Sequence, residues 1–336
     1  MNKLAEGSSA QCKPIRERIK PMGTINKPVL TMLVATALVA GGALRGDSGG
    51  RPPSQTNKSA HSARSRSGNK TNEAIKSGYA PVDGLQIYYE IRGAANGQNP
   101  PLVLLHGGGS TIDTSFGGVL ASFAKTRQVI AFEQQGQGHT ADVDRPFTFE
   151  QTADDTAALL RYLKIQRADF FGYSNGGSIA LQMAIRHPEL VRKLVVASAM
   201  FKRDGLYPEF WESMKHSTPE NMPPELRAAY LRVAPHPEQL PTMHDKSVKR
   251  MLELKDWRPE DVRSIVAPTL VMIGDSDIVR PEHAVEMFRL LPHAQLAVLP
   301  GTDHMTLVKR NDWEVSMIGA FLDAPMPELK QIPEGR

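Results

Sequence analysis

The chain reads FFGYSNGG at residues 170–177, and there a serine flanked by glycines joins two segments with different patterns. The segment 168–171 is short and ends in two aromatic residues, which is typical of a buried strand. Residues 178–186 place apolar side chains at helical spacing among strong helix formers. The sequence therefore predicts that a strand turns sharply into a helix at Ser174.

A turn of this kind holds its central residue in a strained backbone conformation and brings the chain close to itself on both sides. Glycines are needed where a side chain would collide, which is the expected reason for Gly172, Gly176 and Gly177. The turn lifts the hydroxyl of Ser174 clear of the backbone, so this serine is the candidate nucleophile. The first amides of the following helix, including that of Asn175, are expected to face an anion.

Three more strand-like segments end in residues that a nucleophilic serine needs. They are 102–105, which leads into His106-Gly107-Gly108-Gly109; 268–274, which is followed by Asp275 and Asp277; and 296–299, which is followed by His304. A serine hydroxyl is a poor nucleophile at neutral pH, so a base must lie within hydrogen-bond reach and a third group must hold that base in one tautomer. His304 and Asp277 are the candidates for these two roles.

The order Ser, Asp, His along the chain and the G-x-S-x-G turn at 172–176 resemble the α/β-hydrolase fold family, in its esterase-like branch with a cap insertion. The resemblance implies a catalytic triad of Ser174, Asp277 and His304. In relatives the catalytic carboxylate stands three residues after the glycine that ends its strand. That spacing selects Asp277, whereas Asp275 is expected to cap the turn.

The same resemblance implies an oxyanion hole made of backbone amides. Gly108 matches the usual donor in the glycine run, the amide of Asn175 is the second donor, and Gly109 stays open as the alternative to Gly108. His106 is expected to organise the loop through hydrogen bonds and not to act as the base. Many relatives carry arginine where this chain has Gln135, which leaves the anchoring of that loop open.

Charge is distributed unevenly along the 336 residues. The net charge is +4, but residues 1–76 carry 13 Lys and Arg against 4 Asp and Glu, whereas the remainder carries 27 against 32. A mildly acidic body without a basic aromatic stripe gives no surface for phosphate groups, so nucleic-acid binding is not expected. The sequence contains no zinc motif, P-loop or dinucleotide fingerprint, so no metal or cofactor is expected.

Residues 1–44 have the order of a secretory signal, with six Lys and Arg before an apolar run at 29–44. The run is shorter than the roughly 20 residues that a membrane span prefers, so we expect an exported protein with a signal cleaved near Ala43. A retained N-terminal anchor is the alternative, and only then is contact with a membrane expected. Residues 45–77 have almost nothing to bury and predict a disordered linker.

From residue 78 to 325, short apolar strands alternate with helical patterns. The expected strands are 86–91 at the edge of the sheet, 101–105, 128–132, 168–171, 194–197, 268–274 and 295–299, and the expected helices are 149–163, 178–186, 281–291 and 312–322. This alternation predicts an α/β fold with a mostly parallel sheet, helices on both faces, and ligands beyond the carboxyl ends of the strands. The core is assigned to 78–200 and 263–325.

Residues 201–262 interrupt the alternation with many prolines and scattered large apolar side chains. Relatives of this kind carry a helical cap over the site at this place, and short surface helices packed on the core are the alternative. The methionines and aromatics of a cap would line an apolar pocket. No arginine cluster is evident near the motifs to hold a second carboxylate, and an inward-facing Arg203, Arg227 or Arg232 stays open as the alternative.

These features predict a serine hydrolase that cleaves a carboxylic ester or lactone of a small to medium apolar substrate through an acyl-enzyme. Haloalkane dehalogenases and epoxide hydrolases of the family use aspartate where this chain has Ser174, which argues against both. Carbon–carbon bond hydrolysis and cofactor-free perhydrolase activity on the same triad stay open, as does a non-catalytic binding protein with this fold.

Overall fold

The computed structural model describes residues 75–325 except 96 and 98. The signal predicted for 1–44 lies outside the described residues, and so does the predicted linker 45–77 apart from its last three residues. In the part of the chain that is described, no helix is both long and apolar enough to cross a membrane.

The described strands form one eight-stranded sheet in the order β1-β2-β4-β3-β5-β6-β7-β8. They are β1 (Lys76–Val82), β2 (Leu85–Arg92), β3 (Leu102–Leu105), β4 (Val129–Phe132), β5 (Ala168–Tyr173), β6 (Val191–Ala197), β7 (Thr269–Gly274) and β8 (Ala294–Leu299). β2 pairs antiparallel with β1 and with β4, and every other pair is parallel. The expected α/β-hydrolase sheet is confirmed.

The edge of the sheet differs from the prediction. β2 was expected at the edge, but it is paired on both sides, and β1 is the edge strand. β1 begins at Lys76, so the folded body starts two residues earlier than the boundary predicted at residue 78. The sequence pattern missed β1 because only Ala80 and Val82 among its residues are buried, and its other side chains carry no strand signal.

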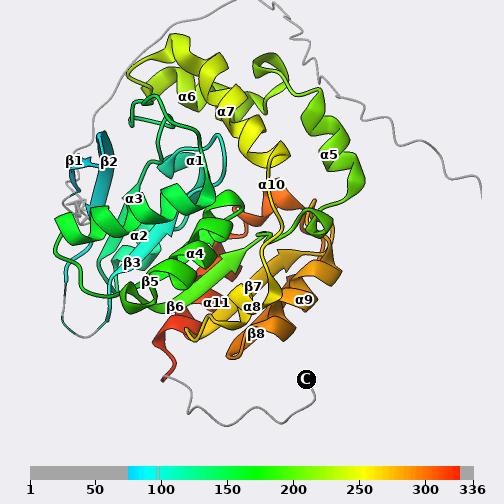
Figure 1. Cartoon of the computed structure of the whole chain (residues 1–336). Helices are drawn as coiled ribbons and strands as arrows, with labels where there is room; N and C mark the ends of the chain where they lie inside the picture. Colours follow the sequence, from blue (N-terminus) through cyan, green and yellow to red (C-terminus); the bar gives the residue numbers. More distant parts are fainter. Residues whose placement is uncertain (1–74, 96, 98, 326–336) are drawn as a thin grey trace, which may run out of the picture. The chain divides into compact units, whose positions relative to one another are not determined.

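Helices cover both faces of the sheet (Figure 1). The helices are α1 (Ile112–Phe116), α2 (Leu120–Ala124), α3 (Phe149–Tyr162), α4 (Asn175–Arg186), α5 (Pro208–Lys215), α6 (Pro224–Val233), α7 (Leu240–Leu252), α8 (Pro259–Arg263), α9 (Pro281–Leu290), α10 (His304–Leu307) and α11 (Asn311–Asp323). Successive strand residues point to opposite faces, so Val103 packs with α3 and α4 in one core whereas Leu104 packs with α1, α2 and α11 in the other. Burial on both faces explains why the strands read as unbroken apolar runs.

The segment predicted as a cap forms α5, α6 and α7, which lie above the sheet in Figure 1. These helices have a proline at their first or second position, where the missing N–H costs no hydrogen bond. This placement accounts for the high proline content of 201–262. α8 contacts the core helices α4 and α9 instead, so the last residues of the predicted cap belong to the core.

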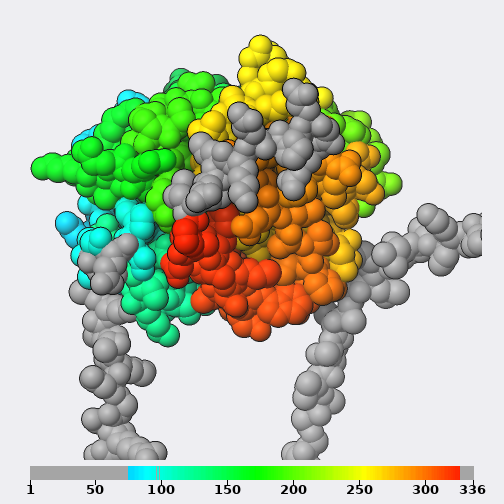
Figure 2. Space-filling model, turned by 90° about the horizontal axis from the view of Figure 1, so that it is seen from below, coloured from blue at the N-terminus to red at the C-terminus, as the bar shows by residue number. Residues whose placement is uncertain are grey.

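α11 packs against α2 on one face of the sheet, and Figure 2, which views the molecule from below, shows it in red. Lys193 at the start of β6 donates from Nζ to the carbonyl oxygens of Phe321 and Leu322 at 2.9 and 3.1 Å. Arg192 bridges the carbonyl of Leu322 at 3.0 Å and the buried carboxylate of Asp169 at 2.6 Å. The last helix is therefore attached to the amino-terminal ends of β5 and β6, whereas Ser174 follows the carboxyl end of β5.

Candidate active site

Ser174 lies between β5 and α4, as predicted, with φ 55° and ψ −123°. Residues other than glycine rarely adopt a positive φ. A Cβ atom on Gly172 would lie 2.2 Å from the carbonyl oxygen of Gly176, and one on Gly176 would lie 1.8 Å from that of Leu105. The predicted steric need for glycine at this turn is confirmed.

The side chains of Ser174, His304 and Asp277 form a hydrogen-bonded row. His304 Nε2 lies 3.0 Å from Ser174 Oγ, and His304 Nδ1 lies 2.8 Å from Asp277 Oδ1. His304 is the first residue of α10, and Asp277 follows β7. With Nδ1–H donating to the carboxylate, Nε2 is left to accept the serine proton. The structure thus brings together the three residues that the sequence singled out.

The carboxylate of Asp277 is buried, and both of its oxygens accept hydrogen bonds. Oδ1 also accepts from the backbone N–H of Val279 at 3.1 Å, and Oδ2 accepts from the hydroxyl of Ser198 at 2.5 Å. Burial alone would raise the pKa of Asp277, but the hydrogen bond and charge of His304 and the donors Ser198 and Val279 outweigh it and hold the pKa below its ordinary value. Asp277 is therefore ionised at neutral pH.

Asp275 has a different environment. Its exposed carboxylate accepts the backbone N–H groups of Gly301 and Thr302 at 3.0 and 3.1 Å, and these two bonds hold its pKa below the ordinary value. Asp275 therefore ties the end of β7 to the turn that precedes His304. In the described structure it makes no hydrogen bond to that histidine.

The glycine run after β3 borders Ser174, and its amides are not equivalent. The N–H of Gly109 donates to Oε1 of Gln137 at 2.6 Å. Within the described residues, the N–H groups of Gly108 and Asn175 donate to no protein group, and both residues line the cavity beside Ser174. Of the two candidates in the glycine run, Gly108 is thus the one with a free amide.

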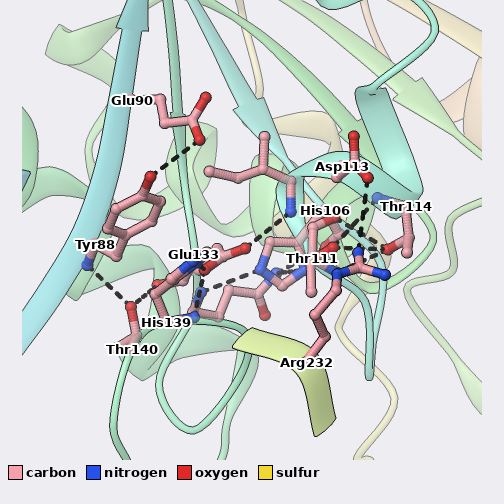
Figure 3. Close-up of polar contacts among 12 residues, drawn as sticks. Tyr88, Glu90, His106, Thr111, Asp113, Thr114, Glu133, His139, Thr140 and Arg232 are labelled. Atoms are coloured by element: carbon pink, nitrogen blue, oxygen red, sulfur yellow. Dashed lines mark hydrogen bonds and ion pairs between the residues drawn. The ribbon is translucent and has the colours of Figure 1, made fainter. Parts of the chain in front are cut away.

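His106 directly precedes the glycine run, and Figure 3 shows it among the polar residues around Glu133. Its Nδ1–H donates to the carbonyl of Gly107 at 2.8 Å, and its Nε2 accepts the N–H of Gln134 at 3.1 Å. Complete burial lowers the pKa of His106, so the ring is neutral. His106 organises the loop, as expected, and lies outside the row that contains Ser174.

Gln135, at the position where relatives carry arginine, anchors its loop by another route. Its Nε2 donates to Oδ1 of Asp142 at 2.7 Å and to the carbonyl of Val143 at 3.1 Å, and its Oε1 accepts Nε–H of Arg145 at 2.6 Å. A guanidinium ten residues away thus joins the contacts of this loop.

Glu133 lies in the same loop. Its Oε2 accepts a hydrogen bond from the backbone N–H of His139 at 2.5 Å and a second from Nδ1 of the same residue at 2.8 Å (Figure 3). The loop is closed on itself by these contacts.

A cavity of about 300 Å³ lies between Ser174 and helices α5–α7. Six methionines contribute to its wall: Met200, Met214, Met222, Met243, Met251 and Met305. Among the described residues that line the cavity, Glu225 is the only carboxylate, and its Oε2 lies 3.7 Å from Nζ of Lys309. The wall is therefore mainly apolar, with the hydroxyl of Ser174 at one side.

Sequence reasoning missed two residues that hold the row in place. Ser198 donates to Asp277, and the hydroxyl of Tyr173 donates to the carbonyl oxygen of His304 at 2.6 Å. Ser198 directly follows the apolar run of β6, so a polar residue at the carboxyl end of a buried strand was an available signal. Nothing in the sequence pattern pairs Tyr173 with a histidine 131 residues away.

Comparison with known proteins gives consistent results. The profile of the alpha/beta hydrolase family matches residues 102–314. The chain is 28% identical over 273 residues to 2-hydroxymuconate semialdehyde hydrolase of Pseudomonas sp. (strain CF600), covering 72% of this chain and 96% of that protein. It is 25% identical over 297 residues to proline iminopeptidase of Lactobacillus helveticus (strain DPC 4571), covering 74% and 98%.

Among solved structures, the enol-lactonase from Burkholderia xenovorans LB400 is similar with a TM-score of 0.60 and 23% identity, covering 73% of this chain and all of that one. The names of the relatives include a peptidase and a semialdehyde hydrolase, so the similarities support the serine-hydrolase class without fixing the bond that is cleaved. Fold and family profile agree, and the chain belongs to the α/β hydrolase family.

Proposed function

We propose that this protein is a serine hydrolase that cleaves a carboxylic ester or lactone of small to medium size through an acyl-enzyme. The observation that supports this most is the row in which His304 lies 3.0 Å from Ser174 and 2.8 Å from Asp277. The row stands beside an apolar cavity, where an acyl group can bind away from water.

The proposed reaction begins when Oγ of Ser174 attacks the ester carbonyl and its proton passes to Nε2 of His304. The ionised carboxylate of Asp277 stabilises the imidazolium that forms. The negative charge that develops on the carbonyl oxygen is held by the free N–H groups of Gly108 and Asn175. His304 then protonates the leaving alkoxide, and afterwards it takes a proton from the water that releases the acid from Ser174.

The volume of the cavity and its apolar wall favour substrates of small to medium size. A volume of about 300 Å³ stands at the small end of ligand pockets, and methionines adapt to irregular apolar shapes. We assign α5–α7 the role of a cap, because residues of all three helices line the cavity over Ser174. Long-chain lipids exceed such a cavity unless the cap moves.

A peptidase function is less favoured by the cavity. Recognition of a free amino terminus needs an unpaired carboxylate, and Glu225, the carboxylate on the described cavity wall, is near Lys309. Hydrolysis of a carbon–carbon bond beside a carbonyl is the second candidate, and the 28% identity to the semialdehyde hydrolase favours it. The same nucleophile and oxyanion donors serve both reactions.

A fluorophosphonate probe tests the nucleophile. We expect the probe to label the intact protein but not Ser174→Ala. Equal labelling of the two proteins, or labelling of neither, would exclude Ser174 as the nucleophile of a serine hydrolase. A panel of nitrophenyl esters of increasing acyl length, assayed beside lactones, then tests the substrate class. Activity that rises steadily to long-chain, micellar esters would contradict the small-substrate proposal, and labelling without turnover of any ester or lactone would favour carbon–carbon hydrolysis.

A further inference from the structure

Two polar side chains of the cap form a pair at the wall of the cavity beside Ser174. They are Ser217, which follows α5, and His244 on α7, and both line the cavity. The cap lines this cavity mainly with apolar side chains, among them Met214 and Met222. The imidazole of His244 is buried, and the reaction proposed above uses neither residue. The pair is therefore polar chemistry in the substrate cavity that still lacks a role.

The hydrogen bond between Ser217 and His244 has a defined direction. Nδ1 of His244 lies 3.3 Å from Oδ1 of Asp245, and this carboxylate favours the tautomer that carries its proton on Nδ1. Nε2 then has a lone pair, and the hydroxyl of Ser217 donates to it at 2.9 Å. Oδ1 of Asn221 is a longer contact at 3.5 Å, so the single hydroxyl proton of Ser217 is committed to His244.

The oxygen of Ser217 therefore keeps lone pairs for a donor in the cavity. Within the described residues, Oγ of Ser217 accepts no hydrogen bond. A substrate carbonyl would bind there only if the hydroxyl turned away from His244, and the buried Nε2 would then lose its donor at a cost similar to the bond gained. A substrate hydroxyl donates to Ser217 without disturbing the pair.

The cavity wall offers a charged group no free partner. No arginine is among the described residues that line the cavity, so an inward-facing Arg203, Arg227 or Arg232 is not found there. Lys309 lies 3.7 Å from Glu225, which leaves neither charge free for a substrate. An uncharged hydroxyl therefore fits this wall better than a carboxylate or an ammonium group.

We propose that Ser217 and His244 form a hydroxyl subsite, and that the acyl group transferred to Ser174 carries a hydroxyl which donates to Ser217. This inference rests on the proposed function and narrows its substrate class to esters of hydroxy acids and to lactones. Both substrates give the same hydroxyacyl-enzyme, because opening a lactone leaves the former ring oxygen on the acyl chain.

The subsite has a particular use when a lactone is opened. Attack by Oγ of Ser174 breaks the bond between the carbonyl carbon and the ring oxygen, and His304 passes the serine proton to that oxygen. The resulting hydroxyl is tethered to the acyl group, and its high effective concentration favours attack on the acyl-enzyme and closure of the ring. A hydrogen bond to Ser217 holds this hydroxyl at the cap until water releases the hydroxy acid.

Matched methyl esters test the subsite. The methyl esters of γ-hydroxybutyric, δ-hydroxyvaleric and ε-hydroxycaproic acid are compared with those of valeric, caproic and enanthic acid, in which a methyl group replaces the hydroxyl. The kcat/KM of each ester is measured by titration of the acid released. In Ser217→Ala the ratio of kcat/KM for a hydroxy ester over its alkyl partner should fall about fivefold or more at the chain length that fits.

Ser213→Ala is the matched control, because Ser213 is an exposed serine on α5 and is not among the described residues that line the cavity. It should keep the wild-type ratio. A smaller fall in Ser217→Ala at every chain length, or an equal loss for hydroxy and alkyl esters, would overturn the subsite.

His244→Phe keeps a ring of similar size and tests the direction of the hydrogen bond. Without Nε2 the hydroxyl of Ser217 is free to donate, so a keto group should bind as readily as a hydroxyl. The ratio of kcat/KM for a secondary hydroxy ester over the keto ester of the same carbon skeleton should therefore fall about fivefold or more. A general loss of stability would affect both esters equally. An unchanged ratio would overturn the role given to His244.

Lactones distinguish the two sources of the hydroxyl. γ-Butyrolactone, δ-valerolactone and ε-caprolactone give the same acyl groups as the hydroxy esters. If lactones are the source, Ser217→Ala should lower their kcat/KM about fivefold or more relative to an alkyl ester, and hydroxy esters should yield more lactone, because ring closure now competes with water. A loss confined to the hydroxy esters, without lactone among the products, would assign the open-chain esters.

A binding measurement separates this inference from the catalytic proposal. Ser174→Ala cannot form an acyl-enzyme, and the preferred hydroxy ester should raise its Tm more than the alkyl partner does. In the same protein with Ser217→Ala added, the two esters should raise Tm equally. This pattern beside a wild-type protein that the fluorophosphonate does not label would leave the subsite standing and remove the hydrolase function. Labelling and ester turnover without any Ser217-dependent effect of the hydroxyl would do the reverse.

Discussion

Ser198 donates its hydroxyl proton to Oδ2 of Asp277 at 2.5 Å, on the carboxylate oxygen that does not face His304. Ser198 follows β6 and has a φ of 52°, which is unusual for a residue other than glycine. With both oxygens engaged, the carboxylate cannot rotate away from the imidazole. β6, the strand between β5 and β7, thus contributes through Ser198 to the orientation of the histidine.

Removing the Ser198 hydroxyl tests this positioning role. We expect Ser198→Ala to lower kcat for ester hydrolysis about tenfold, since a hydrogen bond to a charged group is worth roughly 1.5–3 kcal/mol. KM should change little, because the Ser198 hydroxyl is committed to Asp277. Ser276→Ala, which changes an exposed serine in the loop that carries Asp277, is the matched control and should behave as wild type.

Substitution of Asp277 and substitution of Asp275, the two carboxylates after β7, should have different effects on kcat and Tm. Asp277→Asn no longer fixes the tautomer of His304, and kcat should fall by about 10⁴. Asp275→Asn loses charge from a carboxylate that accepts the N–H groups of Gly301 and Thr302, so it should lower Tm while leaving kcat near the wild-type value. Kinetics and thermal melting of both variants check this assignment. The opposite pattern would assign the triad to Asp275.

Glu314 on α11 should make stability depend on pH. It is 1% exposed, neither carboxylate oxygen has a hydrogen-bond partner in the described structure, and burial raises its pKa from 4.5 to about 8. A raised pKa means that the folded state favours the protonated form. The contribution of this carboxyl to the free energy of unfolding is therefore fully present below about pH 4.5 and is lost as pH rises to about 8.

Glu314→Leu removes this titration. Its free energy of unfolding should exceed that of the wild type by an amount that grows between pH 5 and pH 8.5, on the order of a few kcal/mol at the upper end. Urea unfolding at the two pH values measures the difference. If Glu314→Leu increased the free energy of unfolding by the same amount at both pH values, the carboxyl would not titrate in this range.

The catalytic motifs were accessible to sequence reasoning because they depend on local geometry. The turn at Ser174 needs glycines within two residues on either side, and Asp277 and His304 follow buried strands that are recognised by their apolar runs. β1 was missed because an edge strand with one exposed face has little pattern, and its pairing with β2 supplies the order that its own residues do not encode.

Contacts between distant segments could not be predicted in the same way. Many relatives have an arginine at the position of Gln135, and the sequence did not show which residue holds this loop here. Arg145 donates a hydrogen bond to Gln135 because the chain folds back and brings the two side chains together. Arg250 stands 142 positions from Gly108 and reaches it through the packing of α7. No spacing rule connects such pairs, since their proximity is a property of the whole fold.

Tyr173 and Ser174 are neighbours on one turn, yet the phenol hydroxyl of Tyr173 binds the backbone carbonyl of His304. Ser174 and His304 are thus joined twice, once through the hydrogen bond between their side chains and once through the phenol of the residue that precedes the serine. In the mechanism proposed above, a substrate separates the hydroxyl of Ser174 from the imidazole, and the bond from Tyr173 then still holds the start of α10 next to the end of β5. The hydrogen bond between Ser174 and His304 can therefore break and form again in the proposed reaction while the backbone of His304 stays in place.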